Sequence, residues 1–213
     1  MPLCHLPCCS ESIAILAGRD TVKGMDENVP DQVLVKEALA HRDAFALIVA
    51  RYDTRIRRYV VQLGSLDAET AKDILQETFI KTYLHLNDYD PNLPFSAWLY
   101  RIARNETISH FRKQKNRPRT MESETDLEVF GRIADDLDIE REANTAIDRE
   151  AVRVALDTLD LKYRDVLLLR FFEGKSYDEI SDILELPAGT VAVYLHRAKA
   201  KLKEKLKRYD EQN

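Results

Sequence analysis

Residues 176–202, SYDEISDILELPAGTVAVYLHRAKAKL, carry the strongest local signals in this chain. Ser176 and Glu179 have the spacing of a capping box, in which the hydroxyl accepts from the third helical amide and the carboxylate reaches back. The short helix that they begin is predicted to end near Leu184, and a tight turn follows. The next helix begins near Pro187, because first-turn amides have no intrahelical partner and a proline is tolerated there.

The helix after this turn is long and basic. Its apolar positions recur in steps of three and four and share one face: Val191, Leu195, Ala198, Leu202 and Leu206. Seven Lys and Arg residues fall between Arg197 and Arg208. A short capped helix, a turn and a longer basic helix predict a helix-turn-helix, whose second helix lies in the DNA major groove. A plain helical hairpin has the same periodicity, and the basic cluster argues against it.

The rest of the chain also has helical periodicity. One helix is predicted from Lys162 to Glu173, and Gly174 ends it. Nearer the N-terminus, two amphipathic helices have the expected buried positions Phe45, Val49, Tyr52, Ile56 and Val60, and then Leu75, Phe79, Tyr83 and Leu86. A third helix, from about residue 95 to residue 115, is expected to bury Phe95, Trp98, Leu99 and Ile102.

The predicted fold is all-α, with two small helical domains joined by an acidic linker. Residues 1–30 form an N-terminal extension expected to be disordered, and residues 31–120 form the first domain. The linker spans residues 121–150, where three basic residues face eleven acidic ones. The helix-turn-helix belongs to the second domain, residues 151–213. The low counts of Gly (6) and Pro (7) disfavour a turn-rich β fold.

Charge is unevenly distributed along the chain. The net charge is −5, yet residues 31–120 hold 15 basic and 11 acidic residues, and residues 151–213 hold 12 and 11. Each of these blocks ends in a basic cluster, which creates a local positive potential whatever the net charge. This arrangement favours a polyanionic partner.

Several classes of protein are excluded or disfavoured. No apolar stretch is long enough to insert across a membrane, and the N-terminal residues do not have the pattern of a secretory signal peptide. The cysteines Cys4, Cys8 and Cys9 lie together beside His5, so no disulfide framework supports the fold, as in a reducing cytoplasm. This group could bind zinc or sense oxidation, but a disordered leader is preferred, and we expect no metal and no cofactor. The isolated His residues and the absence of nucleophile or phosphate-binding motifs argue against an enzyme.

Three segments together resemble a known family. Residues 73–81, DILQETFIK, are similar to its core-polymerase-binding helix, and residues 95–105, FSAWLYRIARN, to its −10 element helix. Residues 163–198 are similar to its −35-binding domain. In this order and spacing they resemble the extracytoplasmic-function (group IV) sigma-70 factors of bacterial RNA polymerase, over roughly residues 31–206. The resemblance implies a transcription initiation factor whose partners are core RNA polymerase and promoter DNA, with an anti-sigma factor as a candidate regulator.

The resemblance also implies roles for particular residues, residues 31–120 corresponding to sigma region 2 and residues 151–213 to region 4. Core-polymerase binding would fall to Asp73, Gln76, Glu77 and Lys81. The melted −10 strand would contact Tyr89 and Asn92 in the specificity loop, and Arg101, Arg104, Asn105 and Arg112 on the following helix. Trp98 is assigned to the core, because its spacing matches that of Phe95 and Ile102.

The −35 side departs from the family pattern. Members often carry Lys-Ser-Arg or similar residues after Gly-Thr-Val, but this chain has Ala192, Val193 and Tyr194 there. Direct readout of guanine by bidentate Arg is therefore weak at these positions. Thr190, His196, Arg197 and Lys199 are the remaining candidates for −35 DNA contacts. We expect either recognition through shape and backbone contacts or a −35 sequence unlike the family norm.

A second interpretation is a stand-alone helix-turn-helix regulator that binds DNA without polymerase. The capping box and the basic helix fit it equally well, whereas the segments at 73–81 and 95–105 do not. The sequence leaves open whether the two domains contact each other in the free protein.

Overall fold

The computed structural model describes residues 29–113 and 149–210, and every regular element in these two ranges is helical, as predicted. In chain order the elements are α3 (Asp31–Ala40), η1 (Arg42–Ala44), α4 (Phe45–Gly64), α5 (Ala68–Leu84), η2 (Leu86–Asp88), α6 (Phe95–Lys113), α8 (Arg149–Asp157), α9 (Leu161–Leu167), η3 (Leu168–Phe172), α10 (Tyr177–Leu184) and α11 (Ala188–Asp210). The cysteine-bearing extension and nearly all of the acidic linker lie outside the described residues.

The N-terminal domain is built around α4. Its predicted apolar stripe is buried at Val49, Tyr52, Ile56 and Val60, while Phe45 at its start is half-buried. The helix packs against α3, α5 and α6. The start of α5 is fixed by Asp67, whose side chain accepts a hydrogen bond of 2.9 Å from the backbone N–H of Thr70. This hydrogen bond also lowers the pKa of the Asp67 carboxyl.

The predicted buried stripe of α5 is wrong at one position. Leu75 and Phe79 are buried, but Tyr83 is 37% exposed and contacts the ring of Phe45 edge-on at 5.1 Å. Each step of four residues turns a row by about 40° around a helix, so the third member leaves the buried face. Thr82 takes the inner position instead, and its hydroxyl donates to the carbonyl oxygen of Thr78 at 2.7 Å.

The predicted helix at residues 162–173 consists of two pieces. The α-helix α9 continues directly into η3, a π-helix, after which the N–H of Glu173 donates to the carbonyl of Leu168 at 3.1 Å. Gly174, at φ +64°, then ends the helix, as predicted. The π-helical turn shifts the register of the residues that follow α9.

The helix-turn-helix forms as predicted. Both hydrogen bonds of the capping box are present, with Glu179 N–H donating to the Ser176 hydroxyl at 3.1 Å and Ser176 N–H donating to the Glu179 carboxylate at 2.9 Å. The first helix, α10, ends at Leu184, and Glu185 adopts the left-handed conformation at φ 54°. The apolar stripe of α11 from Val191 to Leu206 is buried against α8, α9 and α10.

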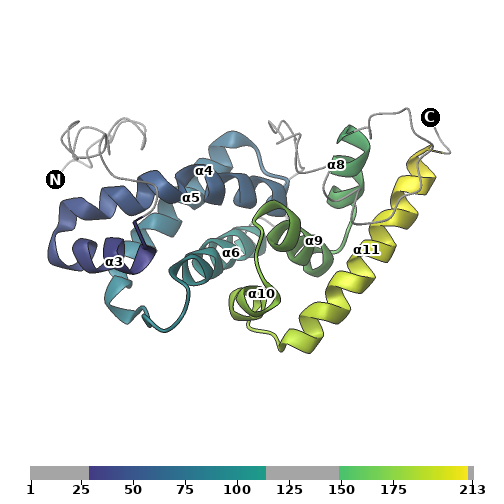
Figure 1. Ribbon diagram of the computed structural model, residues 1–213. Helices are drawn as coiled ribbons and strands as arrows, with labels where there is room; N and C mark the ends of the chain where they lie inside the picture. The colour runs from purple at the N-terminus through teal and green to yellow at the C-terminus, as the bar shows by residue number, and fades with distance from the viewer. Residues whose placement is uncertain (1–28, 114–148, 211–213) are drawn as a thin grey trace.

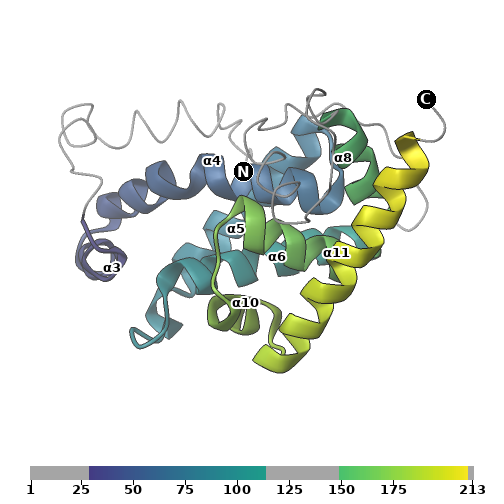
Figure 2. The same ribbon diagram turned by 45° about the vertical axis from the view of Figure 1, so that its right-hand side comes forward.

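The two domains lie against each other. α10 packs on α6, while α9 and η3 contact α4. Figures 1 and 2 show α11 along the outer edge of the molecule in both views, and α10 packs against both α11 and α6. The arrangement therefore leaves one side of α11 uncovered and brings α6 under the C-terminal domain.

Two glycines provide a matched test of the conformation at the end of η3. An added Cβ meets nothing within 4 Å at Gly174 or at Gly189, but only Gly174 has positive φ. We expect Gly174→Ala to lower the free energy of unfolding by about 1 kcal/mol, because L-residues are strained in the left-handed region. Gly189→Ala, inside α11, should raise it by up to about 1 kcal/mol. Urea unfolding followed by circular dichroism measures both, and equal effects would contradict the assigned turn.

Candidate nucleic-acid interface

The loop before α6 is anchored by Tyr89. This residue is buried, its ring lies 5.3 Å from that of Phe95 and 5.5 Å from that of Trp98, and its hydroxyl donates to the carbonyl of Leu93 at 2.5 Å. Asn92, by contrast, is exposed. Its backbone N–H and side-chain amide both donate to Asp90, at 2.9 and 2.8 Å. The loop thus has a buried aromatic base and a polar, exposed tip.

The core residues of α6 are largely those expected. Phe95, Trp98 and Leu99 are buried, whereas Ile102 is half-buried. Trp98 lies among Phe95 and Tyr89, which agrees with its assignment to the core.

The basic strip of α6 divides into two parts. Asn105 and Arg112 are exposed. Arg101 lies 3.5 Å from the carboxylate of Glu185, at the turn of the helix-turn-helix, and Arg104 donates from Nε to Asp165 at 2.6 Å. Two predicted DNA-contacting arginines are therefore paired with carboxylates of the C-terminal domain.

Asp165 is fully buried, and its two side-chain partners among the described residues both belong to the N-terminal domain. Besides Arg104, the hydroxyl of Tyr59 donates to it at 2.7 Å. Burial raises the pKa of Asp165, while Arg104 and Tyr59 act in the opposite direction. Burial and the nearby Asp165 carboxylate raise the pKa of Tyr59 as well, so its hydroxyl stays protonated and serves as a donor.

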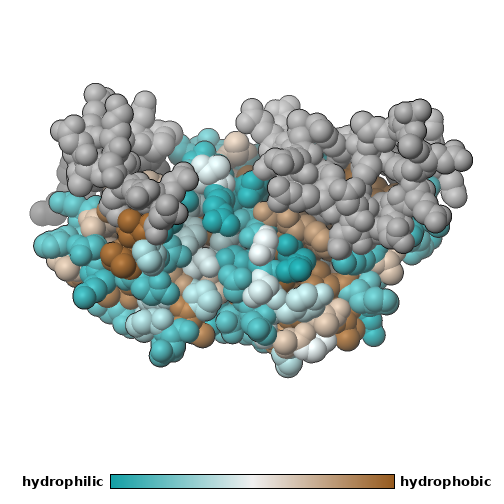
Figure 3. All heavy atoms as spheres, viewed as in Figure 1, coloured by the Kyte–Doolittle hydropathy of each residue, from teal (hydrophilic) through white to brown (hydrophobic). Residues whose placement is uncertain are grey.

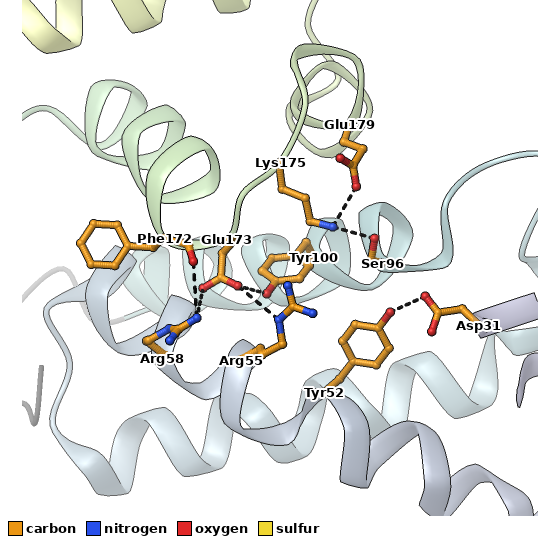
Figure 4. A network of polar contacts seen from close by, with 10 residues as sticks. All are labelled: Asp31, Tyr52, Arg55, Arg58, Ser96, Tyr100, Phe172, Glu173, Lys175 and Glu179. Atoms are coloured by element: carbon orange, nitrogen blue, oxygen red, sulfur yellow. Dashed lines mark hydrogen bonds and ion pairs between the residues drawn. The ribbon is translucent and has the colours of Figure 1, made fainter. Parts of the chain in front are cut away.

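Glu173 forms the second buried junction, shown in Figure 4. Its side chain is 0% exposed, and the hydroxyl of Tyr100 donates to it. Arg58 and Arg55 approach the same carboxylate at 3.4 and 3.8 Å. Burial, together with Glu173, raises the pKa of Tyr100, which keeps this hydroxyl protonated. A buried carboxylate needs such partners, because an unpaired one costs several kcal/mol.

Lys175 and Arg164 extend this contact region, which we call the domain seam. Lys175 donates to the Ser96 hydroxyl at 2.6 Å and to Glu179 at 2.9 Å (Figure 4). Arg164 donates to the Ser65 hydroxyl at 2.8 Å and to the carbonyl of Leu63 at 3.2 Å. On the face shown in Figure 3, the middle of the molecule is largely hydrophilic, with hydrophobic residues to either side.

The seam could not be predicted from the sequence. Its partners lie 61 to 118 residues apart, and no local pattern connects them. One signal was available: Asp165 and Glu173 are carboxylates at the two ends of a helical run that is apolar except for Arg170. Buried charges are rare unless paired, so such residues point to a partner elsewhere in the fold.

The predicted polymerase-binding residues lie on α5. Asp73 and Glu77 are exposed and Gln76 is half-buried, while Lys81 pairs with Glu106 at 2.6 Å. Two exposed apolar residues that were not predicted follow on the same side of α5 as Asp73 and Glu77: Ile80, 44% exposed, and Leu84, 66% exposed. We define the α5 face as Asp73, Gln76, Glu77, Ile80 and Leu84. Exposed apolar residues next to carboxylates are suited to a protein partner.

The predicted −35 residues lie on α11. His196 and Arg197 are exposed, whereas Thr190 and Lys199 are half-buried. The ammonium of Lys199 lies 5.3 Å from the centre of the Phe171 ring. None of these four residues contributes to the contacts described across the seam.

Within residues 29–113 and 149–210, no cluster of three or more His, Cys, Asp or Glu side chains could hold a metal ion. In the same residues, no helix has the length and apolar character that crossing a membrane requires.

These features define a class: a helical DNA-binding protein with two domains, one carrying a helix-turn-helix and the other a basic helix beside an anchored loop. Comparison with models of known protein families identifies both domains. The model described as sigma-70 region 2 matches residues 48–117, and that described as sigma-70 region 4 matches residues 149–202.

Curated proteins and solved structures agree. The ECF RNA polymerase sigma factor SigW of Bacillus subtilis is 34% identical over 178 residues, covering 78% of this chain and 90% of SigW. RNA polymerase sigma factor CnrH of Cupriavidus metallidurans is 32% identical over 183 residues, covering 84% and 95%. The structure of CnrH with the cytosolic domain of CnrY has a TM-score of 0.62 at 26% identity, covering 84% of this chain and 97% of that one. RpoE with the anti-sigma factor NepR from Bartonella quintana has a TM-score of 0.57 at 25% identity, covering 76% and 96%.

The chain belongs to the ECF sigma factors of the sigma-70 family. It is a sigma factor that directs RNA polymerase to promoters.

The hydroxyl of Tyr100 can be tested as a seam contact. We expect Tyr100→Phe to weaken domain closure by about 1–3 kcal/mol, because it removes a donor from a buried carboxylate. Hydrogen exchange of the α6 peptide and the radius of gyration by X-ray scattering should both increase. Tyr52→Phe is the matched control, because Tyr52 donates to Asp31 inside the N-terminal domain. Equal responses of the two variants would contradict a seam held by Tyr100.

Proposed function

We propose that this sigma factor binds core RNA polymerase through the α5 face, captures the melted −10 strand with α6 and its preceding loop, and binds the −35 element with α11. It works in the cytoplasm with the polymerase and has no catalytic activity of its own. The observation that carries the proposal is the match to both sigma regions, in order, on a chain whose helix-turn-helix is complete.

The α5 face suits a protein partner. Asp73 and Glu77 supply negative charge for a basic polymerase surface, and Ile80 and Leu84 supply apolar area whose burial stabilises the complex. A patch with an apolar centre and charged surroundings is typical of protein interfaces.

The −10 strand requires a positive track for phosphates and a pocket or stack for bases. Arg101, Arg104 and Arg112 supply the cations on α6. Asn105 supplies an amide that can pair with a base edge, and Asn92 lies at the exposed tip of the loop.

Closure of the domains competes with this role. Arg104 donates from Nε to Asp165 and Arg101 lies beside Glu185, so both cations are engaged by carboxylates while the domains are packed together. We therefore propose that separation of the two domains favours binding of the −10 strand. Since CnrH and RpoE of Bartonella quintana were solved in complexes, RpoE with an anti-sigma factor, we also propose that an anti-sigma factor regulates this chain.

The alternative of a stand-alone regulator retains one supporting observation. The outer side of α11 is exposed while the domains are packed together, so it is accessible without polymerase. This alternative gives no role to the α5 face.

Run-off transcription distinguishes the two functions. With core polymerase and a pooled promoter library, we expect specific start sites only when the protein is added. The double variant Asp73→Lys, Glu77→Lys should weaken core binding at least about tenfold, because like charges then meet across the interface. Glu37→Lys, at an exposed carboxylate of α3, is the control. DNA binding without any core binding by the unaltered protein would favour the stand-alone regulator.

The competition at Arg104 gives a second test. We expect Asp165→Asn to increase affinity of the free protein for single-stranded −10 DNA about tenfold or more, because a charge-assisted hydrogen bond across the seam is weakened. Asp160→Asn makes the same charge change at an exposed site outside the seam and should have little effect. Fluorescence anisotropy measures both, and equal affinities would contradict closure as a competitor.

A further inference from the structure

The exposed side of α11 has an unusual composition for a helix that enters a DNA groove. At about 100° per residue, the side opposite the buried stripe has Val193 at its centre. Beyond residue 200 this side carries the charged residues Glu204 and Lys207. Up to residue 200 its uncharged members are small or apolar, with one exception: Gly189, Val193, His196 and Ala200, with Ala192 toward one edge. All five are exposed, and Val193 is 46% exposed. His196 has the one side chain among them that can hydrogen-bond to a base.

Cations lie along both edges of this strip. Arg197 and Lys201 fall on one edge, and Lys199 and Lys203 on the other. Lys199 is positioned over the ring of Phe171 at 5.3 Å and Lys201 over that of Tyr163 at 5.4 Å. The major groove has the complementary layout, with base edges at its floor and phosphates on both walls. The charge pattern thus directs the strip containing Val193 at the base edges.

The N-terminal part of such a helix is the part nearest the bases. In α11 this part contains Ala192 and Val193, which have no hydrogen-bonding atoms in their side chains. A base donor or acceptor facing them would lose its water without gaining a partner, which is unfavourable. The thymine C5 methyl is the apolar group that base pairs present in the major groove, and contact with it has no such cost.

We propose that α11 selects its −35 element through contact of Ala192 and Val193 with thymine methyl groups, while the flanking cations bind phosphates. This inference rests on the proposed function, because it assumes that α11 enters the −35 groove. It makes Val193 a specificity-determining residue and gives the −35 element a definite chemistry: A·T pairs at the positions facing the first turns of α11.

Deoxyuridine provides a direct test, because it pairs as thymidine does and lacks the methyl group. The −35 element is first identified by run-off transcription with core polymerase and a pooled promoter library. Each thymidine of the element, on either strand, is then replaced by deoxyuridine, and holoenzyme affinity is measured by competition. Loss of one buried methyl contact should weaken binding about fourfold. Phosphate contacts are unchanged by this replacement.

Val193→Ala connects the effect to the residue. For the native element we expect this variant to bind several-fold more weakly, and to be nearly insensitive to deoxyuridine at the position that Val193 contacts. Val33→Ala is the matched control, since Val33 is a valine of similar exposure, 45%, on α3 of the other domain. It should retain the full deoxyuridine effect.

The possible results distinguish failure of the methyl-contact inference from failure of the proposed sigma-factor function. Two results would overturn recognition through thymine methyl groups: promoters without A·T pairs at these positions, or equal affinity for −35 DNA containing thymidine and for the same DNA containing deoxyuridine. In either case the specific start sites would still support a sigma factor. A deoxyuridine effect that Val193→Ala leaves intact would also overturn the role of Val193. If no start sites arise with the protein present, the proposed function itself fails.

Discussion

Asp165 and Glu173 are carboxylates that the C-terminal domain buries, and their polar partners described in residues 29–113 and 149–210 all come from the N-terminal domain. Charge cannot stay buried without compensation, so the position of one domain on the other follows from this requirement. Arg104 and Tyr59 compensate one carboxylate, and Tyr100 with two arginines compensates the other. The buried hydrophobic residues of the two domains form one continuous cluster, and the polar pairs of the seam add a directional requirement on how the domains meet.

A seam of this kind is suited to opening. Ion pairs and hydrogen bonds can be exchanged for water or for other anions with little net change in free energy, whereas an apolar interface would expose area that costs about 25 cal/mol per Å². A nucleic-acid backbone presents the same charge as Asp165 and Glu185 to the same arginines of α6. The C-terminal domain thus covers two arginines of the proposed −10 strip with carboxylates, which carry the same negative charge as a phosphate.

The two helices proposed to bind DNA, α6 and α11, are unequally exposed in this closed arrangement. The basic strip of α6 is partly occupied by the C-terminal domain, while the outer side of α11 stays exposed. The α5 face also lies clear of the described seam contacts. In the closed arrangement the proposed polymerase-binding surface and the proposed −35 helix are therefore exposed, whereas the proposed −10 strip is partly covered.

Interactions between residues close together in the sequence made much of the secondary structure predictable. The capping box of Ser176, the glycine stop at residue 174 and the apolar stripe of α11 depend on neighbours within a few residues, so the helix-turn-helix could be predicted closely. The outward position of Tyr83 follows from the rotation of each four-residue step and was predicted wrongly. The π-helical turn after Leu167 could not be predicted, because it depends on how the neighbouring helices pack. The pairing of Arg101 and Arg104 with carboxylates could not be predicted either, because their partners, Glu185 and Asp165, lie 61 or more residues away. Periodicity shows which residues face inward, but only packing in three dimensions brings distant charges together, because ion pairing depends on distance in space and not along the chain.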